Sequence, residues 1–406
     1  MALEFADSNR GRVTYTREPG ESYGEPIANF VGKIVRLTSS SLVANKGTAV
    51  SEELRSDSMV SDLIETDFST GGDLGCEWIL GGTWEDFLQS ALRSTFGDTT
   101  TYTAGTTLTC DSNDLTYVAS NPIFINTVPG DFIYVQGFTA EANNGWKQVN
   151  LVNSTTSVRV IATPGSLTDE SGAVQPEGVM KTVFNGVEKH SYNMEQFFPD
   201  LSTAGISQLF LGQRVGTWSL NISAGSIVTG TWGFQGTEVT AQEGTYATSE
   251  PGPADDDPVI GATADVANIT VDNEAVPCRV QSITLNLDNG LRIQNSIGSK
   301  FPCGIGYGRQ TITGNITVYF QSLTDYTDFL DHKDVQIWWD FDDALGNHMR
   351  VKLPRVKYAT GSPMLEGIDT DVMVSLDFQA LASETSYGGD PRQIEVATYS
   401  VAASVV

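Results

Sequence analysis

The fold is indicated first by the stretch Ser282-Ile-Thr-Leu-Asn-Leu-Asp-Asn-Gly-Leu-Arg-Ile293. Its apolar residues alternate with polar ones, which is typical of a β-strand with one face in a core. The tripeptide Asp288-Asn-Gly290 that ends the alternation is the strongest short-range signal for a tight β-hairpin turn. After the glycine-punctuated segment 304–308, alternation resumes over Thr311–Gln321, and a short helix is predicted at 325–330. The sequence therefore predicts a unit of strand followed by helix.

The same unit occurs earlier in the chain. A short strand is predicted at Gly75–Leu80, and Thr83 is placed to cap a helix behind it. Five apolar residues of this helix fall on one buried face: Trp84, Phe87, Leu88, Ala91 and Leu92. The two helices share the pattern aromatic-x-Asp-Phe-Leu, at Trp84–Leu88 and Tyr326–Leu330. We therefore expect a core made of two pseudo-duplicated halves.

Length and composition favour a large, mainly β protein. With 406 residues the chain can bury a sizeable core, and this length suggests two or three compact units. Charged residues make up only 18% of the chain, glycine is abundant with 40 residues, and short runs of Thr, Ser and Val end at Gly or Pro. These features are typical of an all-β protein with many turns, in which helix is a minority.

The charge balance excludes one class of function. The chain has 23 basic and 50 acidic residues and a net charge of −27, whereas nucleic-acid-binding proteins attract phosphates with basic patches. Cys76, Cys110, Cys278 and Cys303 form no CxxC pair, and the N-terminus lacks the regions of a signal peptide, so free thiols in a cytoplasmic product are expected. No apolar run approaches the ~18 residues of a membrane span, so no membrane partner is expected.

The composition divides the chain into three parts. Residues 1–97 begin with a polar, turn-rich N-terminal segment, which is expected to be an extended N-terminal arm, and continue into the first half of the core. Residues 98–178 are rich in Thr, Asn and Ser and contain alternating runs of their own, enough for an inserted β domain of about 80 residues. Residues 179–406 hold the second half, with a long polar loop at 238–259 and an apolar C-terminal segment.

No catalytic, cofactor or metal site is predicted. His190, His332 and His348 do not form a zinc-hydrolase motif and are expected at the surface. The glycines at 304–308 miss the spacing of a dinucleotide-binding loop, and the adjacent aspartates at 255–257 lack EF-hand spacing. We therefore expect a protein that is not an enzyme.

One aromatic pair allows an alternative function. Trp338 and Trp339 precede three acidic residues and resemble a sugar platform beside carboxylates. In an extended strand the two rings point to opposite faces, so one is expected in the core and the other at a contact with a neighbouring chain. A β-rich adhesin or carbohydrate-binding surface module is the alternative that this pair supports. A glycosidase is disfavoured because no pair of acids is identifiable.

The segment Ser51–Phe68 is extended in pattern and strongly acidic. Its only basic residue is Arg55, and its acidic residues are Glu52, Glu53, Asp57, Asp62, Glu65 and Asp67. A solvated strand face is the simplest interpretation of such a run. Glu53 and Asp57 share one face if the segment is a regular strand, whereas a bend near Ser58 would change the register of Asp62 and Glu65.

An ordered series of short motifs runs through both halves of the core. In the first half they are Glu21–Pro26, Leu54–Asp57 with Val60–Asp62, and Gly75 followed by Trp84–Leu88. In the second half they are Ile227–Gly230 with Phe234 and Gly236, Asn289–Leu291, Gly306–Gly308, Thr313-Gly314 with Tyr319-Phe320, Leu353–Val356, and Gly367 with Asp369, Asp371 and Val372. In these motifs and their order the chain resembles the major tail tube protein of long-tailed, non-contractile, siphovirus-type bacteriophages. The resemblance covers about residues 11–97 and 179–385 and leaves the insert outside.

The resemblance implies a tail-tube-type β-sandwich with flanking short helices, related in fold to the type VI secretion tube protein. It implies a structural virion protein, assembled in the host cytoplasm, whose hexameric rings stack into the tail tube that conducts the genome into the host cell. Ring closure would pair sheet edges that otherwise invite aggregation. The implied partners are other copies of the chain and the tape measure, tail terminator and distal tail proteins, while genome DNA passes without specific binding.

Three further expectations accompany this resemblance. The bore is expected to be acidic, lined by Glu53, Asp57, Asp62 and Glu65, because DNA carries one negative charge per about 1.7 Å of axis and slides most freely past a lining that does not attract it. The insert is expected on the outside of the tube, where a large addition is tolerated most easily. The N-terminal region, the 238–259 loop and the C-terminal segment are expected to become ordered mainly when rings stack.

Overall fold

The computed structural model describes residues 6–20, 23–162, 165–272, 274–276, 278–363, 367–368, 370–383 and 391–401. Its strands before the insert are β1 (Arg12–Arg17), β2 (Lys33–Ile34), β3 (Ser39–Ser40), β4 (Val43–Val50), β5 (Leu63–Glu77) and β6 (Gly97–Tyr102). The strands of the insert are β7 (Thr107–Asp111), β8 (Thr116–Ala119), β9 (Phe132–Val135), β10 (Gly145–Ser154), β11 (Ser157–Val160) and β12 (Glu170–Val174).

The strands that follow the insert build most of the body. They are β13 (Gly178–Phe184), β14 (Tyr192–Phe198), β15 (Ile206–Ser223), β16 (Thr229–Gly236), β17 (Glu238–Glu243), β18 (Val266–Val271), β19 (Glu274–Ala275), β20 (Val280–Asp288), β21 (Arg292–Gln294), β22 (Gly304–Gly306), β23 (Thr311–Tyr319), β24 (Val335–Asp342), β25 (His348–Tyr358), β26 (Met373–Ala380) and β27 (Glu395–Val401). The helices are α1 (Thr83–Leu92) and α2 (Leu323–Leu330), each after a strand as predicted, with a 3-10 turn at Glu141–Asn143. The prediction of a mainly β protein in which helix is a minority is confirmed, and the strands form multiple antiparallel sheets.

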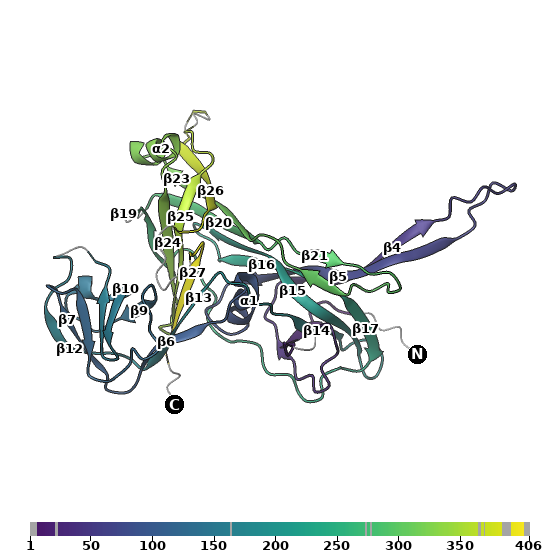
Figure 1. The fold of residues 1–406 in the computed structure, drawn as a ribbon, viewed down its shortest axis with the longest axis horizontal. Coiled ribbons are helices and arrows are strands. Elements are labelled where there is room, and N and C mark those ends of the chain that lie inside the picture. Colours follow the sequence, from purple (N-terminus) through teal and green to yellow (C-terminus); the bar gives the residue numbers. More distant parts are fainter. Residues whose placement is uncertain are drawn as a thin grey trace.

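The body is an antiparallel sheet system with two projections. Figure 1 shows the lobe of β7–β12 on one side of the body and a long hairpin, made by β4 and β5, extending from the other. The central ladder runs β5-β16-β15-β20-β23-β26, with every neighbouring pair antiparallel. Strand β15 has 18 residues and belongs to two sheets, because its first part pairs with β14 and β17 while its second part pairs with β16 and β20.

The core of the body is organised by stacked indoles. Trp78, Trp84, Trp218 and Trp232 are each at most 1% exposed, and neighbouring rings stack with centroids 5.5–6.0 Å apart. They come from the residue directly after β5, from α1, from β15 and from β16, so the packing fixes the helix against the central ladder. Helix α1 forms here because its apolar residues recur at helical spacing and all point into this cluster.

The N-terminus of α1 is capped from a distance, which corrects the prediction for Thr83. Gly82 is the N-cap residue and has no side chain to offer. Asp255 supplies the acceptor instead, because its Oδ2 accepts hydrogen bonds from the Thr83 backbone N–H and from Thr83 Oγ1, each at 2.8 Å. The carboxylate also forms an ion pair with Lys33 at 2.7 Å. A negative charge at this end is favoured by the helix dipole.

The Asp288-Asn-Gly290 sequence does not make a tight hairpin, so that prediction was wrong. Strand β20 pairs with β23, with Asp288 opposite Thr311, and the chain between them forms the small hairpin of β21 and β22. Asn289 is buried, and its side-chain amide donates to the carbonyl oxygens of Ala91 and Val215 at 3.0 and 3.1 Å. These long-range hydrogen bonds fix the turn against the end of α1 and against β15.

Segments expected to become ordered on stacking are paired within the subunit. Strand β1 lies between β14 and β2, and β27 lies between β13 and β25. Residues 238–243, expected to begin the long loop, form β17. Farther along the loop, the buried Glu195 carboxylate accepts a hydrogen bond from Tyr246 N at 2.6 Å, and Gly252 N donates to Gly32 O at 2.9 Å. The last residues of the C-terminal segment, 402–406, lie outside the described part of the chain.

The insert forms a six-stranded sheet of its own, in the order β12-β7-β8-β11-β10-β9. Strand β6 pairs instead with β13 of the body, with Tyr102 opposite Gly178, so the chain leaves the body and returns at neighbouring positions. The apolar core of the insert continues into the body, where it includes Met180, Ala397 and Tyr399. The two parts therefore share a packed boundary.

Asp131 in the insert gives a test of stability against pH. It is 4% exposed and accepts a hydrogen bond from Val128 N at 2.8 Å, and burial raises its pKa to about 6. Because the folded pKa lies above the unfolded value, this group stabilises the fold below pH about 4, and that stabilisation is lost as the pH rises through about 6. Asp131→Asn keeps an acceptor oxygen and should raise the free energy of unfolding at pH 7.5 by up to about 3 kcal/mol, with little change at pH 4.

The measurement is denaturant unfolding at the two pH values. Asp114→Asn, an exposed position in the same lobe, is the matched control and should change neither value. An equal gain at both pH values would show that the variant acts through something other than the buried charge.

Candidate assembly surface

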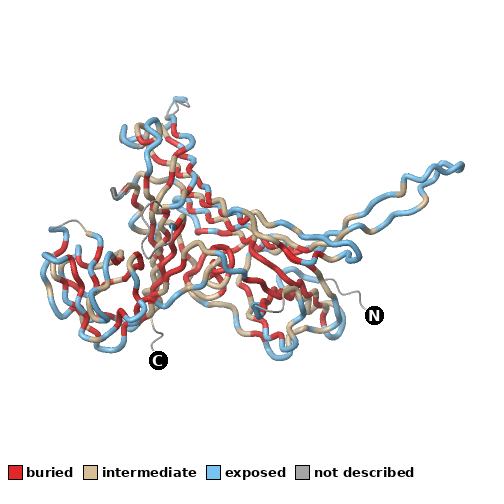
Figure 2. Tube along the Cα trace, viewed as in Figure 1, coloured by how far each residue is buried: buried red, intermediate tan, exposed pale blue. Residues whose placement is uncertain are grey.

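The most unusual feature of the molecule is the hairpin of β4 and β5 with its tip, residues 43–71, which we call the arm. The eight residues of β4 pair antiparallel with β5, from Val43 opposite Gly71 to Val50 opposite Leu63. Figures 1 and 2 show that the arm stands away from the body and is exposed along most of its length. An isolated two-stranded ribbon is marginally stable in water, so the arm is a segment that a further contact would stabilise.

The arm carries a concentration of exposed apolar side chains. Among the described residues, 22 large hydrophobic side chains are exposed, and seven of them fall within residues 43–64. Leu54 at the tip is fully exposed, at 101%, and the other six are Val43, Val50, Met59, Val60, Leu63 and Ile64. Large exposed apolar side chains gathered on one segment are typical of a site of contact with another protein. The arm is therefore the candidate assembly surface of this chain.

The base of the arm is braced by the loop between β21 and β22. Phe68 N donates to Lys300 O at 2.9 Å, and the rings of Phe68 and Phe301 meet edge to face with centroids 5.4 Å apart. The Lys300 ammonium lies 4.9 Å from the Phe301 ring centroid. Beyond this brace, the described residues of the arm tip from 51 to 62 are mostly exposed. The base is thus fixed in direction while the tip is left open to solvent.

The acidic residues proposed for the bore all lie on the arm, but they do not share one strand face. Residues 51–62 form no regular strand, so the condition under which Glu53 and Asp57 would share one face is not met. Asp57 accepts two hydrogen bonds from Arg55, at 2.7 and 3.0 Å, and this pairing lowers its pKa. Glu65, on β5, lies 3.6 and 3.7 Å from the ammonium groups of Lys46 and Lys300. Glu53 and Asp62 are left as acids of the tip without such an ion pair among the described residues.

The tryptophan pair, two of the histidines and the cysteines differ in how far they are buried. Trp339 is completely buried and Trp338 is half-buried, so the expectation that one ring enters the core is confirmed. His190 is 5% exposed, which corrects the expectation of a surface position, and burial lowers its pKa. His348 is partly buried and stacks on Tyr134, with ring centroids 4.0 Å apart. Cys76 and Cys110 are buried and unpaired, and Cys278 and Cys303 are exposed and unpaired.

The described residues contain no group of three or more His, Cys, Asp and Glu side chains arranged to hold a metal ion. No helix in the described ranges has the length and apolar character needed to cross a bilayer.

Sequence reasoning found the acidic character of the arm but missed its apolar tip. Leu54 is separated from the adjacent Met59 and Val60 by polar and charged residues, so the three form neither a helical nor a strand pattern. The sequence signal that could have revealed the apolar tip is the presence of large apolar residues inside a highly charged run. When no helix or strand of the subunit buries such residues, they indicate a contact with another chain.

Fold and surface together define a β-rich structural subunit with an exposed segment suited to contacts between chains. A family model described as phage tail tube protein matches residues 8–380. The chain belongs to the phage tail tube protein family. It is therefore a structural component of the virion tail that assembles with itself and with other tail components, and its family is not a class of enzymes. A search of curated proteins finds no match.

Proposed function

We propose that this chain closes into hexameric rings that stack into the tail tube, and that the tube conducts the phage genome into the host cell. The observation that carries the proposal is the arm, with seven large apolar side chains exposed within residues 43–64 of a tail tube family member. Burying one such side chain contributes about 1.5–3 kcal/mol, so a neighbouring subunit that covers the arm gains substantial stability. The arm then serves as the contact between successive subunits.

A free sheet edge supports closure into a ring. Within the described chain, β4 pairs only with β5, so its other edge is unpaired. Exposed edges invite uncontrolled pairing with other chains, and closed symmetric assembly removes them. The proposed assembly takes place in the host cytoplasm and ends against the tape measure, tail terminator and distal tail proteins.

Electron microscopy of the purified protein tests this proposal. Negatively stained samples at high protein concentration should show long hollow polymers with sixfold symmetry in end views. Discrete single particles at every concentration would contradict the assignment, and another rotational symmetry would contradict the hexamer alone.

We also propose that the bore is acidic, with Glu53 and Asp62 of the arm tip contributing and the paired Asp57 and Glu65 contributing less. Acidic side chains repel the DNA phosphates, so the duplex keeps its counterions and is not held by the wall. Screening limits this repulsion to about 8 Å at physiological salt, which confines its effect to the lining itself.

Reversing the charge of the tip should slow DNA delivery. Phage that carry Glu53→Lys with Asp62→Lys should form tubes of normal length but eject their genome several-fold more slowly, and added salt should restore part of the rate. The measurement is DNA release from purified particles at two ionic strengths. Asp114→Lys with Glu141→Lys, two exposed positions on the insert, makes the same change of net charge and is the control. Equal release rates for both double variants would place the tip outside the bore.

The insert is proposed to lie on the outside of the tube. It joins the body through β6 and β13, whose paired ends Tyr102 and Gly178 are neighbours, so the whole lobe leaves from one point of the body. Figure 1 shows it on the side of the body opposite the arm. A lobe in this position adds bulk without interrupting the central ladder of strands.

A further inference from the structure

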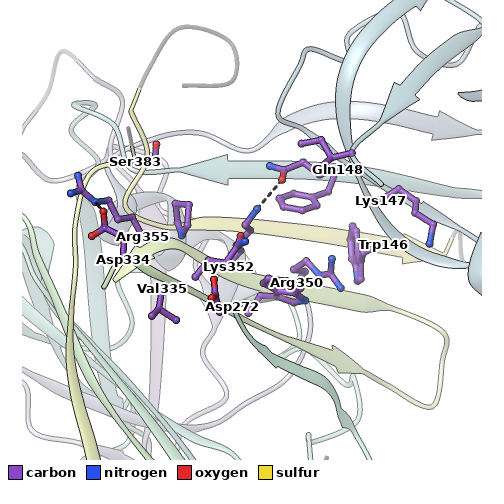
Figure 3. A pocket seen from close by; sticks show the side chains of 15 residues that line it. Trp146, Lys147, Gln148, Asp272, Asp334, Val335, Arg350, Lys352, Arg355 and Ser383 are labelled. Carbon is purple, nitrogen blue, oxygen red and sulfur yellow. Dashed lines mark hydrogen bonds and ion pairs between the residues drawn. The ribbon is translucent and has the colours of Figure 1, made fainter. Parts of the chain in front are cut away.

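A groove lies where the insert meets the body. It has a volume of about 590 Å³ and is lined by β10 and β9 of the insert on one side and by β24 and β25 of the body on the other. Figure 3 shows Trp146 lying toward Arg350 and Gln148 toward Lys352, with a hydrogen bond between Gln148 and Lys352. Two parts of the chain about 200 positions apart therefore contribute to one site.

The groove is basic, unlike the protein as a whole. Its lining contains the cations Lys147, Arg350, Lys352 and Arg355 and the acids Asp272 and Asp334. Arg350 forms an ion pair with Asp340 and Arg355 forms one with Asp334, so Lys147 and Lys352 are the lining cations without an ion pair among the described residues, in a chain whose net charge is −27. A local reversal of sign in a concave site attracts anions.

The two lysines of the groove are held by neutral partners. Lys352 Nζ donates to Gln148 Oε1 at 2.8 Å, and Lys147 Nζ donates to the carbonyl oxygens of Ala142 and Asn144 at 3.0 and 2.7 Å. Burial and the nearby Arg350 charge lower the pKa of Lys352 and lower that of Lys147 to about 8. A bound anion would stabilise the charged form of both lysines.

Arg350 is oriented by the body and surrounded by aromatic rings. Its guanidinium forms two hydrogen bonds with the buried Asp340, at 2.6 and 2.8 Å. The guanidinium carbon lies 5.9 Å from the ring centroids of Trp146 and Trp338 and 5.8 Å from that of Phe132. Planar guanidinium groups bind carboxylates in a defined geometry, and aromatic rings around them exclude water.

The aromatic walls of the groove offer a half-buried ring face. Trp146 is 7% exposed and lines one wall. Trp338 lines the opposite wall and is only partly covered. Pockets that combine aromatic faces with a few converging polar groups are typical of small-molecule and sugar sites.

We propose that this groove binds an acidic saccharide, a sugar that carries a carboxylate. The carboxylate would lie between Lys352 and Arg350, and an apolar face of the sugar ring would pack on Trp338. An acidic peptide is less well suited, because β24 pairs with β18 and β25, and β25 pairs with β24, β26 and β27. These strands offer no free edge to a peptide backbone. The site belongs to the single subunit, so it is independent of the proposed tube.

The test is calorimetry with the full chain and three probes: tri-galacturonate, the neutral sugar maltotriose, and hexaglutamate. Tri-galacturonate should bind at least tenfold more tightly than maltotriose or hexaglutamate, and less tightly as salt is raised. Trp338→Ala and Lys352→Met should each weaken its binding about tenfold, which corresponds to about 1.4 kcal/mol. Lys181→Met, a partly buried lysine on β13 paired with Glu85, is the control and should bind like the wild type.

Several outcomes would overturn the proposal. One is no binding of tri-galacturonate by the wild-type chain at millimolar concentration. Another is stronger binding of hexaglutamate, which would make the groove a peptide site. The third is unchanged affinity in variants whose thermal unfolding shows that they fold, and unfolding curves of all three variants decide this point. If Trp338→Ala does not fold, Trp338→Phe tests the same wall with a smaller loss of packing.

Discussion

Subunits that carry Leu54→Asp should fold normally and remain single particles at concentrations at which the wild-type chain forms long polymers. Leu54 is fully exposed at the tip of the arm, so the substitution removes no contact within the subunit. In a stacked assembly the same side chain would be buried against a neighbour. Losing its burial costs about 1.5–3 kcal/mol per contact, or roughly 10–20 kcal/mol for six contacts of a ring, and burying a carboxylate adds to this.

Sedimentation and negative-stain microscopy measure this effect, with thermal unfolding as the check on folding. The concentration needed for polymerisation should rise at least a hundredfold. Ile125→Asp is the matched control, because Ile125 is also an exposed apolar residue, 67% accessible, but lies on the insert. Polymers of normal length from both Leu54→Asp and Met59→Asp would show that the arm tip makes no essential contact.

Removing the insert should give polymers that are thinner but still hollow. The deletion should take out residues 103–177 and join Tyr102 to Gly178 through a short glycine linker, because these two residues already face each other in the β6–β13 pair. A cut at the expected boundary after residue 97 would remove β6 itself, which pairs with the body. Deleting only residues 103–177 keeps β6 and leaves the central ladder and the arm intact, so the ring contacts should persist.

The deletion exposes part of the boundary with the body. Met180, Ala397 and Tyr399 pack against the insert and would face water without it. Met180→Thr in the shortened chain reduces this apolar surface and guards against aggregation. The measurement is the outer diameter of the polymers by electron microscopy. A soluble, folded deletion product that fails to polymerise would show that the insert takes part in ring contacts.

Local sequence patterns correctly predicted the elements in which the local preference and the packing in the fold favour the same structure. The alternation of Ile283, Leu285 and Leu287 predicted β20, and the helical spacing of Trp84 and Leu88 predicted α1. Both predictions succeeded because the apolar face of each element is buried in the same core. The prediction of a tight hairpin at Asp288–Gly290 was wrong because the Asn289 side chain forms hydrogen bonds with Ala91 and Val215, which are distant in sequence. Tertiary hydrogen bonds decided that turn.

Segments with weak patterns were the ones misassigned. The strand β1 has only Val13 and Tyr15 as apolar anchors inside a polar, turn-rich region, so its place between β14 and β2 has no strong local signal. The groove was beyond prediction for another reason. Trp338 was recognised as an aromatic residue on a strand face, but its opposite wall comes from Trp146 in the insert. Only the packing of the two parts brings these residues together.

Strand β15 has a mechanical consequence. Because its 18 residues run without interruption from the sheet of β14 and β17 into the sheet of β16 and β20, a force on one sheet passes directly along a single backbone to the other. Antiparallel hydrogen bonds lie across the strands, so a pull along β15 loads many of them together in shear. We expect each subunit to resist stretching as one stiff element, and a bent tail to flex at the joints between subunits.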